Sequence, residues 1–305
     1  MKDQMAAIEI NRSREMAVFV HIVEQGGFSA AARVCRMTPS AISKLIARLE
    51  TRLGARLVNR STRRFQLTPE GCVFYERATH ILADIADAER SAGAGERPFG
   101  RVRLTTSASY AIHILAPILP DFLDLYPDIT LDIVQTDMVI DLLSERTDVA
   151  VRAGPLKSSS LVARKLGETP SVITAAPGYL NRFGVPETIA DLDRHRRLGF
   201  GYLRAIDGWP LKQHDETLVH PASGRVQASD GEALRQLALS GNGLARLALF
   251  TVRDDIAAGR LVPVLERFNP GDHETFYAVH TGGSGPLPSR VRALLDFLAA
   301  RGRVE

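Results

Sequence analysis

Cysteine is scarce in this sequence, which has only Cys35 and Cys72 among its 305 residues. Two thiols cannot form a disulfide framework, and so low a count fits a reducing cytoplasm. We expect each cysteine to be a small buried residue rather than a redox sensor. No apolar run of about 18 residues occurs, which argues against a membrane span. Residues 1–10 have no apolar core, so no secretory signal is predicted and we expect a cytoplasmic protein.

Motifs for catalysis and cofactor binding are missing as well. Gly241 and Gly243 are not followed by the third glycine of a dinucleotide-binding loop, because Arg246 stands in its place. No Gly-x-x-x-x-Gly-Lys sequence occurs, and residues 283–285 are too loop-like for a nucleophile elbow. The eight histidines lack the spacing of metal ligands. We therefore predict no catalytic residue, no metal and no cofactor, and hence no enzyme.

Charge is unevenly distributed along the chain, although the formal net charge is only +3. Residues 1–70 contain 12 Lys and Arg against 6 Asp and Glu, whereas the remaining residues contain 26 against 29. A basic N-terminal part on a slightly acidic remainder is typical of a protein whose basic part meets a polyanion. Charge alone does not identify that polyanion as nucleic acid, since a basic surface is often only solvated.

Residues 14–54 have the pattern of two short helices joined by a tight turn. Helical periodicity begins near Met16 and ends at residues 26–27, which are both glycine. Ser29 is expected to cap a short helix that contains three consecutive alanines. Thr38 is expected to cap the next helix, with Pro39 at its first position and Gly54 after its end at Leu53.

The second of these helices is amphipathic. Its apolar side is formed by Ile42, Leu45, Ile46, Leu49 and Leu53. The opposite side is short and polar near its start and basic along its edges; it contains Ser40, Lys44, Ala47 and Thr51, flanked by Ser43 and Arg48. Such a face suits a helix that enters the major groove of DNA. On the pattern alone, an ordinary helical hairpin with a solvated face remains an equal alternative.

Residues 57–71 predict a β-hairpin, because two apolar stretches flank a polar and basic tip. Arg63 and Arg64 lie at that tip and could contact phosphates or enter a minor groove. Together with the two helices, this hairpin would complete a winged helix-turn-helix.

The order of these residues resembles the N-terminal domain of LysR-type transcriptional regulators over about sixty residues without a gap. The resemblance rests on Phe19, Phe28-Ser29, Ala31-Ala32, Thr38 to Ser43, Leu49-Glu50, Leu53-Gly54, Leu57, Arg60, Leu67-Thr68 and Gly71. Gly27, Cys35 and Val58 depart from the usual family residues without removing an expected DNA contact. The expected DNA-binding residues are Ser29, Thr38, Pro39, Ser40, Ser43, Lys44, Arg48, Arg60, Arg63 and Arg64.

A further helix is expected from Thr68 and Pro69 onward. Its apolar residues recur with a period near 3.5, at Phe74, Ala78, Ile81, Ile85 and Ala88. This stripe suits a partner helix, and the resemblance implies a dimerising linker at residues 71–96. The alternative is that the stripe packs on its own domain. Residues 91–95 are small and are expected to form a hinge.

The remaining residues alternate between strand and helix patterns, which predicts an α/β domain with parallel-type sheets. Helices are expected over residues 110–126, 138–145, 232–239 and 289–301. Strands are expected over residues 102–106, 131–134, 149–151, 172–175, 199–202, 226–228, 244–247, 261–264 and 276–279. Ligands of such sheets bind at the carboxyl ends of strands.

The resemblance extends to this region through residues 148–156, 241–247 and 258–265. It implies an effector-binding domain at residues 97–305, with two Rossmann-like lobes similar to periplasmic binding proteins. Lobe I would comprise residues 97–168 and 271–305, and lobe II residues 169–270. The effector residues that the resemblance implies are Thr106, Ser107, Ser109, Arg152, Gly201, Tyr202 and Arg246.

Other roles for several of these residues remain open. The hydroxyls at residues 106–109 precede a helix and could cap it rather than hold an anion. Arg152 could be a surface cation and Arg246 a structural ion-pair partner. Trp209, between Gly208 and Pro210, is expected to pack in a hairpin rather than line the pocket.

Three classes of function are compatible with this domain arrangement. An enzyme with a basic appendage lacks a grouped nucleophile and base, and a solute-binding transport protein would not need the basic part. The resemblance favours a transcriptional regulator whose expected partners are promoter DNA, a small-molecule effector, RNA polymerase and further copies of the chain. An organic anion is one candidate class of effector, and the expected assembly is a homodimer or homotetramer.

Overall fold

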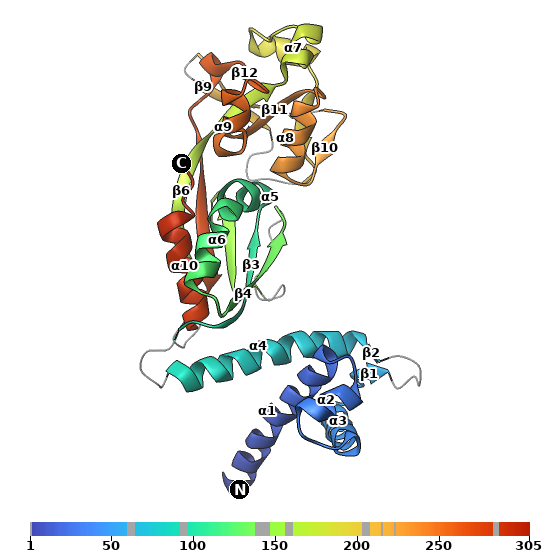
Figure 1. Cartoon of the computed structure of the whole chain (residues 1–305). Coiled ribbons are helices and arrows are strands. Elements are labelled where there is room, and N and C mark those ends of the chain that lie inside the picture. The colour runs from blue at the N-terminus through green and yellow to red at the C-terminus, as the bar shows by residue number, and fades with distance from the viewer. Residues whose placement is uncertain are drawn as a thin grey trace. The chain divides into compact units, whose positions relative to one another are not determined.

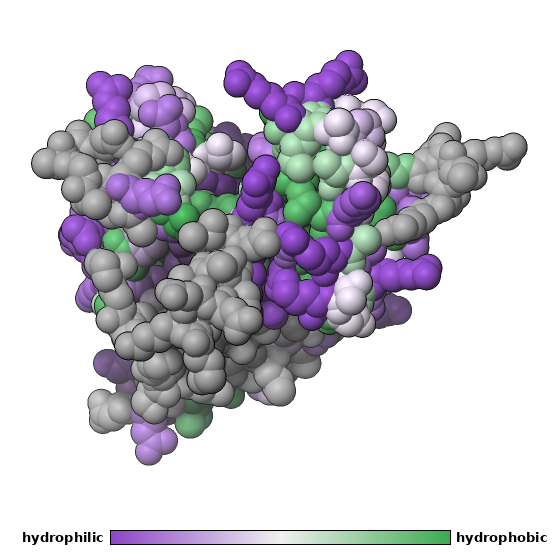
Figure 2. Space-filling model, turned by 90° about the horizontal axis from the view of Figure 1, so that it is seen from below, coloured by the Kyte–Doolittle hydropathy of each residue, from purple (hydrophilic) through white to green (hydrophobic). Residues whose placement is uncertain are grey.

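The computed structural model describes residues 2–59, 65–91, 97–137, 147–155, 161–202, 208–214, 216–222, 224–282 and 287–305. The chain divides into two compact units, residues 1–96 and 97–305, here called the head and the body (Figure 1). In the coloured part of the surface in Figure 2, hydrophilic side chains surround smaller apolar areas. Each unit has its own apolar core and is described separately.

The head contains four helices and a short hairpin in the part that the structure describes. The helices are α1 (Lys2–Glu24), α2 (Phe28–Val34), α3 (Pro39–Leu53) and α4 (Pro69–Ser91). The strands β1 (Val58–Asn59) and β2 (Gln66–Leu67) pair antiparallel. The core is formed by apolar side chains from α1, α2, α3 and the hairpin, and it includes Phe19, Ile22, Ala31, Ala32, Ile42, Ile46, Leu49 and Leu57.

The expected boundaries of α3 are confirmed. Thr38 is the N-cap, and its hydroxyl accepts a hydrogen bond from the amide of Ala41 at 3.2 Å. Pro39 occupies the first helical position, where a missing N–H leaves no intrahelical bond unmade. Gly54 ends the helix with a φ of 67°, a left-handed conformation that glycine adopts without a steric penalty.

Three expectations for the head are wrong. Ser29 is not a cap, because α2 begins at Phe28, two residues earlier than expected, and Gly27 takes the N-cap position. Leu53 is exposed rather than part of the buried stripe, since α3 ends there and no further turn continues the stripe. Cys72 is exposed rather than buried, whereas Cys35 is partly buried and packs against the core of the head. Cys72 lies about 200° around α4 from Phe74, which packs on α1.

The body is built on one sheet with the strand order β10-β7-β11-β6-β13-β5-β3-β4, and β12 pairs with β6. Its longest strand, β6 (Leu161–Ala175), pairs antiparallel with β13 (His273–Thr281) along one part and with β11 (Leu244–Ala248) along the other. The sheet therefore has two halves, and each is the centre of one lobe (Figure 1). The two lobes that the resemblance implies are confirmed.

In lobe I, β3 (Gly100–Thr106) lies parallel to both β4 (Ile129–Gln135) and β5 (Val149–Ala153). A helical run follows β3, with α5 (Ala108–Tyr110), a π-helical turn η1 (Ala111–Leu115) and α6 (Ala116–Leu125). The helix α10 (Ser289–Arg301) has the expected bounds and supplies much of the core, including Val291, Leu294 and Leu298.

In lobe II, β7 (Arg197–Phe200) lies parallel to β10 (Gln227–Ala228) and β11. Helices α8 (Gly231–Leu239) and α9 (Leu249–Ala257) pack on one face, where Leu234 and Val252 join Ala245 and Leu247 in a core. The other face carries α7 (Pro177–Phe183), η2 (Ile189–Arg194), η3 (Glu266–Phe268) and the hairpin of β8 (Trp209–Gln213) and β9 (Glu216–His220), whereas β12 (Val262–Pro263) lies in the sheet beside β6.

The expected α/β class is confirmed, but the sheet is mixed rather than parallel-type. The crossover strands β6 and β13 are antiparallel to each other, because β6 leads the chain from lobe I into lobe II and β13 leads it back. The strand expected at residues 172–175 is only the end of β6, because the polar first half of β6 hides the strand pattern. The helix expected at residues 138–145 lies outside the described residues. Trp209 is buried in its hairpin, as expected.

Gly167 marks the crossover between the lobes. Its φ is 140°, and the backbone of Val304 passes so close that a β-carbon on Gly167 would lie 1.9 Å from the Val304 carbonyl oxygen. The amide of Val304 donates to the Leu166 carbonyl at 3.1 Å. Only glycine fits at such a close approach of two backbones.

Candidate DNA-binding and effector-binding sites

The start of α3 presents small polar groups to solvent. Thr38, Pro39, Ser40, Ser43 and Lys44 are all exposed. The hydroxyls of Thr38 and Ser40 lie 3.1 Å apart, so the cap also orients the first side chain of the helix. Since Ile42 and Ile46 hold the opposite side in the core, this face is fixed relative to the rest of the head. The arrangement leaves short donors and acceptors, followed by one cation, free to approach a ligand.

Arg48 has a second role within the head. Its Nε donates to Glu15 at 2.6 Å, and Arg52 donates to the other oxygen of Glu15 at 2.8 Å. The Glu15 side chain is only 3% exposed, so these two arginines balance a carboxylate that is nearly buried. The pair of bonds ties α3 to α1. Ser29 lies on the exposed side of α2, in its first turn.

Two residues to which the sequence analysis gave no role in the wing hold the base of its hairpin. The carboxylate of Glu50 accepts from the amides of Leu57 at 2.8 Å and Val58 at 3.2 Å. The hydroxyl of Thr68 donates to the carbonyl of Arg56 at 2.6 Å. A polar residue near the end of an amphipathic helix that faces inward is the pattern that could have identified Glu50. Arg60, Arg63 and Arg64 lie outside the described residues.

The apolar stripe of α4 divides into two parts. Phe74 packs edge-on against Phe19 of α1 with ring centroids 5.4 Å apart, and Ala78 is fully buried. Ile81 and Ile85 are 42% and 38% exposed. The first part of the stripe therefore packs in the core of the head, which is the alternative to a dimer seam given in the sequence analysis. The second part is exposed to solvent. The side chain of Ala88 lies outside the described residues.

The turn after β3 combines a buried hydroxyl with a helix cap. Thr106 is fully buried, and no hydrogen-bond partner for its hydroxyl lies among the residues that the structure describes. Ser107 caps the helical run by accepting from the amide of Tyr110 at 3.1 Å, which is the capping role left open above. Ser109 is buried at the edge of lobe II, since a β-carbon on Gly231 would lie 2.9 Å from its hydroxyl oxygen.

Arg152 lies near this turn, at the end of β5. It donates to the carbonyl of Thr136 at 3.5 Å. Burial lowers the pKa of Arg152, and the nearby carboxylate of Asp137 partly opposes that change. Asp137 also accepts a hydrogen bond from the amide of Gly231 at 3.2 Å. The strand ends of lobe I thus meet the first turn of α8, and Asp137 and Gly231 were not among the predicted site residues.

Gly201 and Tyr202 follow β7 in lobe II. The amide of Gly201 donates to the carbonyl of Ala228 at 2.9 Å, and Ala228 precedes Asp230, the N-cap of α8. Tyr202 packs edge-on against Phe200 with ring centroids 5.4 Å apart. Gly201 therefore lies beside the segment that leads into α8, the same helix that contacts Ser109 and Asp137. A strand end followed at once by an Asp cap is the pattern that could have identified this segment.

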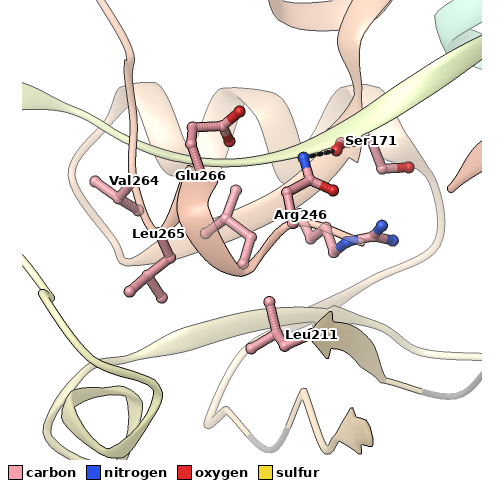
Figure 3. Close-up of a pocket in the computed structure, with 8 residues that line it drawn as sticks. Ser171, Leu211, Arg246, Val264, Leu265 and Glu266 are labelled. Carbon is pink, nitrogen blue, oxygen red and sulfur yellow. Dashed lines mark hydrogen bonds between the residues drawn. The ribbon is translucent and has the colours of Figure 1, made fainter. Parts of the chain in front are cut away.

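Arg246 lies on the other face of the lobe II sheet from α8. It stands opposite Ile173 in the β11–β6 register and forms an ion pair with Asp272. Arg246 lines a small pocket in lobe II together with Ser171, Ile173, Leu211, Val264, Leu265, Glu266 and Asn269 (Figure 3). The Asn269 side-chain amide closes one side by donating to the Ser171 carbonyl at 2.9 Å. No described contact joins Arg246 to residues 106–109, so it stands apart from the other predicted effector residues.

None of the helices in the described part of the chain combines the length and apolarity needed to cross a membrane. Two family models match the sequence. The model described as "Bacterial regulatory helix-turn-helix protein, lysR family" matches residues 13–72, and the LysR substrate binding domain model matches residues 95–303. Together these two matches cover the head and the body.

Relatives match over nearly the whole chain. The HTH-type transcriptional regulator CrgA of Neisseria meningitidis is 38% identical over 287 residues, which covers 94% of this chain and 95% of CrgA. The HTH-type transcriptional activator AaeR of Escherichia coli is 33% identical over 292 residues, with 95% and 93% covered.

Solved structures agree with these matches. The structure of CrgA, a LysR-type regulator, matches with a TM-score of 0.64 at 36% identity and covers 95% of this chain and 98% of that one. The full-length structure of AphB, a virulence activator of Vibrio cholerae, matches with a TM-score of 0.59 at 27% identity over 94% and 98%. This chain belongs to the LysR family of DNA-binding transcriptional regulators, with an effector-binding body behind its helix-turn-helix.

Proposed function

We propose that this regulator binds an interrupted palindrome in promoter DNA as a homodimer or homotetramer. Its mode of DNA binding changes when a small organic anion binds in the body. The observation that carries the DNA part is the exposed face at the start of α3. Ser40, Ser43 and Lys44 are held outward by an apolar side that is buried in the head. Short polar groups at a helix N-terminus approach base edges, and longer cations reach phosphates.

The other predicted DNA contacts have positioning roles in this proposal. Thr38, Pro39 and Ser29 are exposed and are assigned to backbone contacts beside the groove. Arg60, Arg63 and Arg64 of the wing are assigned to phosphates or a minor groove. Arg48 donates to Glu15, and its contribution to DNA is the placement of α3 together with a share of the positive charge.

The assembly is proposed to form through the exposed part of the α4 stripe. Ile81 and Ile85 lie one helical turn apart, and their exposure leaves apolar surface for a second helix. Two copies paired in this way would place two recognition helices in major grooves about 34 Å apart or a multiple of that distance.

The effector is proposed to bind beside the turn after β3, where Thr106, Ser107 and Ser109 lie close to Arg152. A buried hydroxyl with no partner among the described residues and a partly desolvated guanidinium both suit a carboxylate. Gly201 and Tyr202 would meet the effector from lobe II. Arg246 has the weakest support of the predicted residues, since it is paired with Asp272 on the other sheet face.

The response is proposed to pass from the body to the DNA. Effector binding would favour one arrangement of the lobes over another and so bias the angle between the DNA-binding heads. DNA bending and contact with RNA polymerase would then change. The protein would act in the cytoplasm, as an oligomeric regulator rather than as an enzyme.

Footprinting of genomic fragments captured by the purified full-length protein tests this proposal. We expect protection of two half-sites related by a two-fold axis, with a protein mass of at least a dimer by light scattering. Protection of a single asymmetric half-site by a monomer would contradict it. Genes beside the captured fragments would then indicate the chemical class of the effector.

A further inference from the structure

The two lobes of the body meet at the first turn of α8. The amide of Gly231 donates to Asp137 of lobe I at 3.2 Å, and the hydroxyl of Ser109 lies against Gly231. The Nε2 atom of His113 in lobe I lies 2.8 Å from a carboxylate oxygen of Glu232. Three side chains of lobe I therefore hold one turn of lobe II, and His113–Glu232 is the contact among them that pairs an imidazole with a carboxylate.

Glu232 is held in its ionised form. Its side chain is 13% exposed, and that of His113 is 16% exposed. Burial by itself raises the pKa of Glu232, but hydrogen bonds from Gln236, His113 and Arg235 outweigh burial and lower it. Arg235 in turn donates to Asp255 of α9 at 2.6 Å, so the carboxylate is part of a charge network that continues through lobe II.

The position of His113 is set by the local backbone and by an aromatic neighbour. It is the middle residue of the π-helical turn η1, a conformation that is rare and occurs mostly at functional sites. Its ring packs edge-on against Phe250 of α9, with centroids 6.4 Å apart and planes at 83°. The ring is therefore oriented from both lobes, only a few residues beyond the Ser107 cap.

We propose that His113 and Glu232 form an interlobe latch that is strong when the imidazole is protonated and weak when it is neutral. The neutral ring keeps one hydrogen bond but loses the attraction between opposite charges. The charged groups connected to the pair are Arg235 of α8, which donates to Glu232 at 2.6 Å, and Asp255 of α9, which accepts from Arg235 at 2.6 Å.

The latch gives the body a closed arrangement before any effector binds. If closure is partly formed in the free protein, the apparent affinity for an effector rises with the closed fraction. The latch therefore makes the response to the effector stronger at mildly acidic pH than at mildly alkaline pH. This inference does not depend on which effector binds.

Hydrogen–deuterium exchange of the full-length protein without ligand tests the latch. After correction for intrinsic rates, peptides over residues 229–239 and 107–116 should exchange about three- to tenfold more slowly near pH 6 than near pH 8. His113→Gln should raise exchange at both values and abolish the pH dependence. Glu232→Gln should have the same effect, and the double variant should exchange no faster than either single variant.

Arg301→Gln is the matched control, because Arg301 pairs with Asp121 at 2.6 Å within lobe I and does not join the lobes. It should leave both peptides unchanged. Two results would overturn the latch. One is a His113→Gln protein that keeps the pH dependence of the wild type. The other is additive exchange in the double variant, which would mean that the two side chains act separately.

Discussion

The head and the body reach their cores by different routes. In the head, neighbouring elements in the sequence pack on one another, so that α1, α2 and α3 share a core formed within about forty residues. In the body, β6 pairs with β13, about a hundred residues later in the chain, and the end of the chain returns to Gly167. Local patterns therefore predict the head well, whereas the body depends on pairings between distant segments.

Two glycines give the strongest test of this division. A β-carbon on Gly71 would lie 2.0 Å from the Leu57 carbonyl oxygen, and one on Gly167 would lie 1.9 Å from that of Val304. Gly71→Ala should destabilise the head and Gly167→Ala the body, each by about 3 kcal/mol or more. Calorimetry of the full-length protein should show only one unfolding transition moving in each variant.

Gly178 serves as the control for this pair, because a β-carbon there meets nothing within 4 Å. Gly178→Ala should leave both transitions near their wild-type temperatures. If either of the first two variants lowers both transitions equally, head and body unfold as one unit, and the separation drawn above is wrong.

The second prediction concerns the exposed part of the α4 stripe. Ile81→Asp together with Ile85→Asp would place two charges in a helix–helix interface, at a cost of several kcal/mol. We expect light scattering to report a monomer whose head still unfolds cooperatively. Val34→Asp, at an exposed apolar residue of α2, should leave the mass unchanged. An unchanged mass for the double variant would place the interface elsewhere.

The third prediction concerns the turn after β3. Ser107→Ala removes one hydrogen bond to a charged group, and an anionic effector should bind about ten- to a hundredfold more weakly. The search begins with a thermal-shift screen of the full-length protein against benzoate, short aliphatic carboxylates and neutral benzamide. Titration calorimetry then compares wild type and variant. Hits that are all neutral, or an unchanged affinity, would leave Ser107 as the cap that the structure already shows.

The fourth prediction separates base contacts from phosphate contacts in the head. Ser43→Ala should mainly relax sequence preference, by about 1–3 kcal/mol at one position of the site. Arg63→Ala should weaken specific and random DNA alike and lower the salt slope by roughly 1. Binding titrations at several salt concentrations give both quantities. An equal loss of preference in the two variants would refute the division of roles.

The smallest expected effect is a pH dependence of the body alone. Hydrogen bonds and ion pairs outweigh burial and lower the pKa values of Glu232 and Asp255 below 4.5 and 3.8. Carboxyls with a lowered folded-state pKa stabilise the fold above their unfolded-state pKa and lose that contribution as the pH falls through the lowered value. The unfolding temperature of the body should therefore decrease as the pH is lowered below about 4, and Glu232→Gln should make that decrease smaller. An identical acid profile in the variant would exclude Glu232 as a source.

In the candidate sites, too, the residues that local sequence patterns define could be predicted, and those that depend on contacts between distant segments could not. Thr38, Pro39 and Gly54 mark the ends of α3 through local backbone chemistry, so the sequence identifies them without tertiary information. Ser29 is misplaced by two residues because a flexible Gly-Gly turn does not by itself fix where the next helix begins. The partners of Glu50 and Asp137 could not be predicted, since each accepts from an amide that other segments bring to it.

The sequence by itself determined the helix-turn-helix, the α/β class of the body and the family, because these depend on periodicity, caps and a gap-free order of residues. The tertiary structure decided which of several plausible roles each residue has. It divided the α4 stripe between the head's own core and an open surface, and it paired Arg246 with Asp272 away from the turn after β3. It also brought His113 to Glu232 across the lobes. The physical reason is that a cation or an apolar stripe has many possible partners, and only the packing of distant segments selects one.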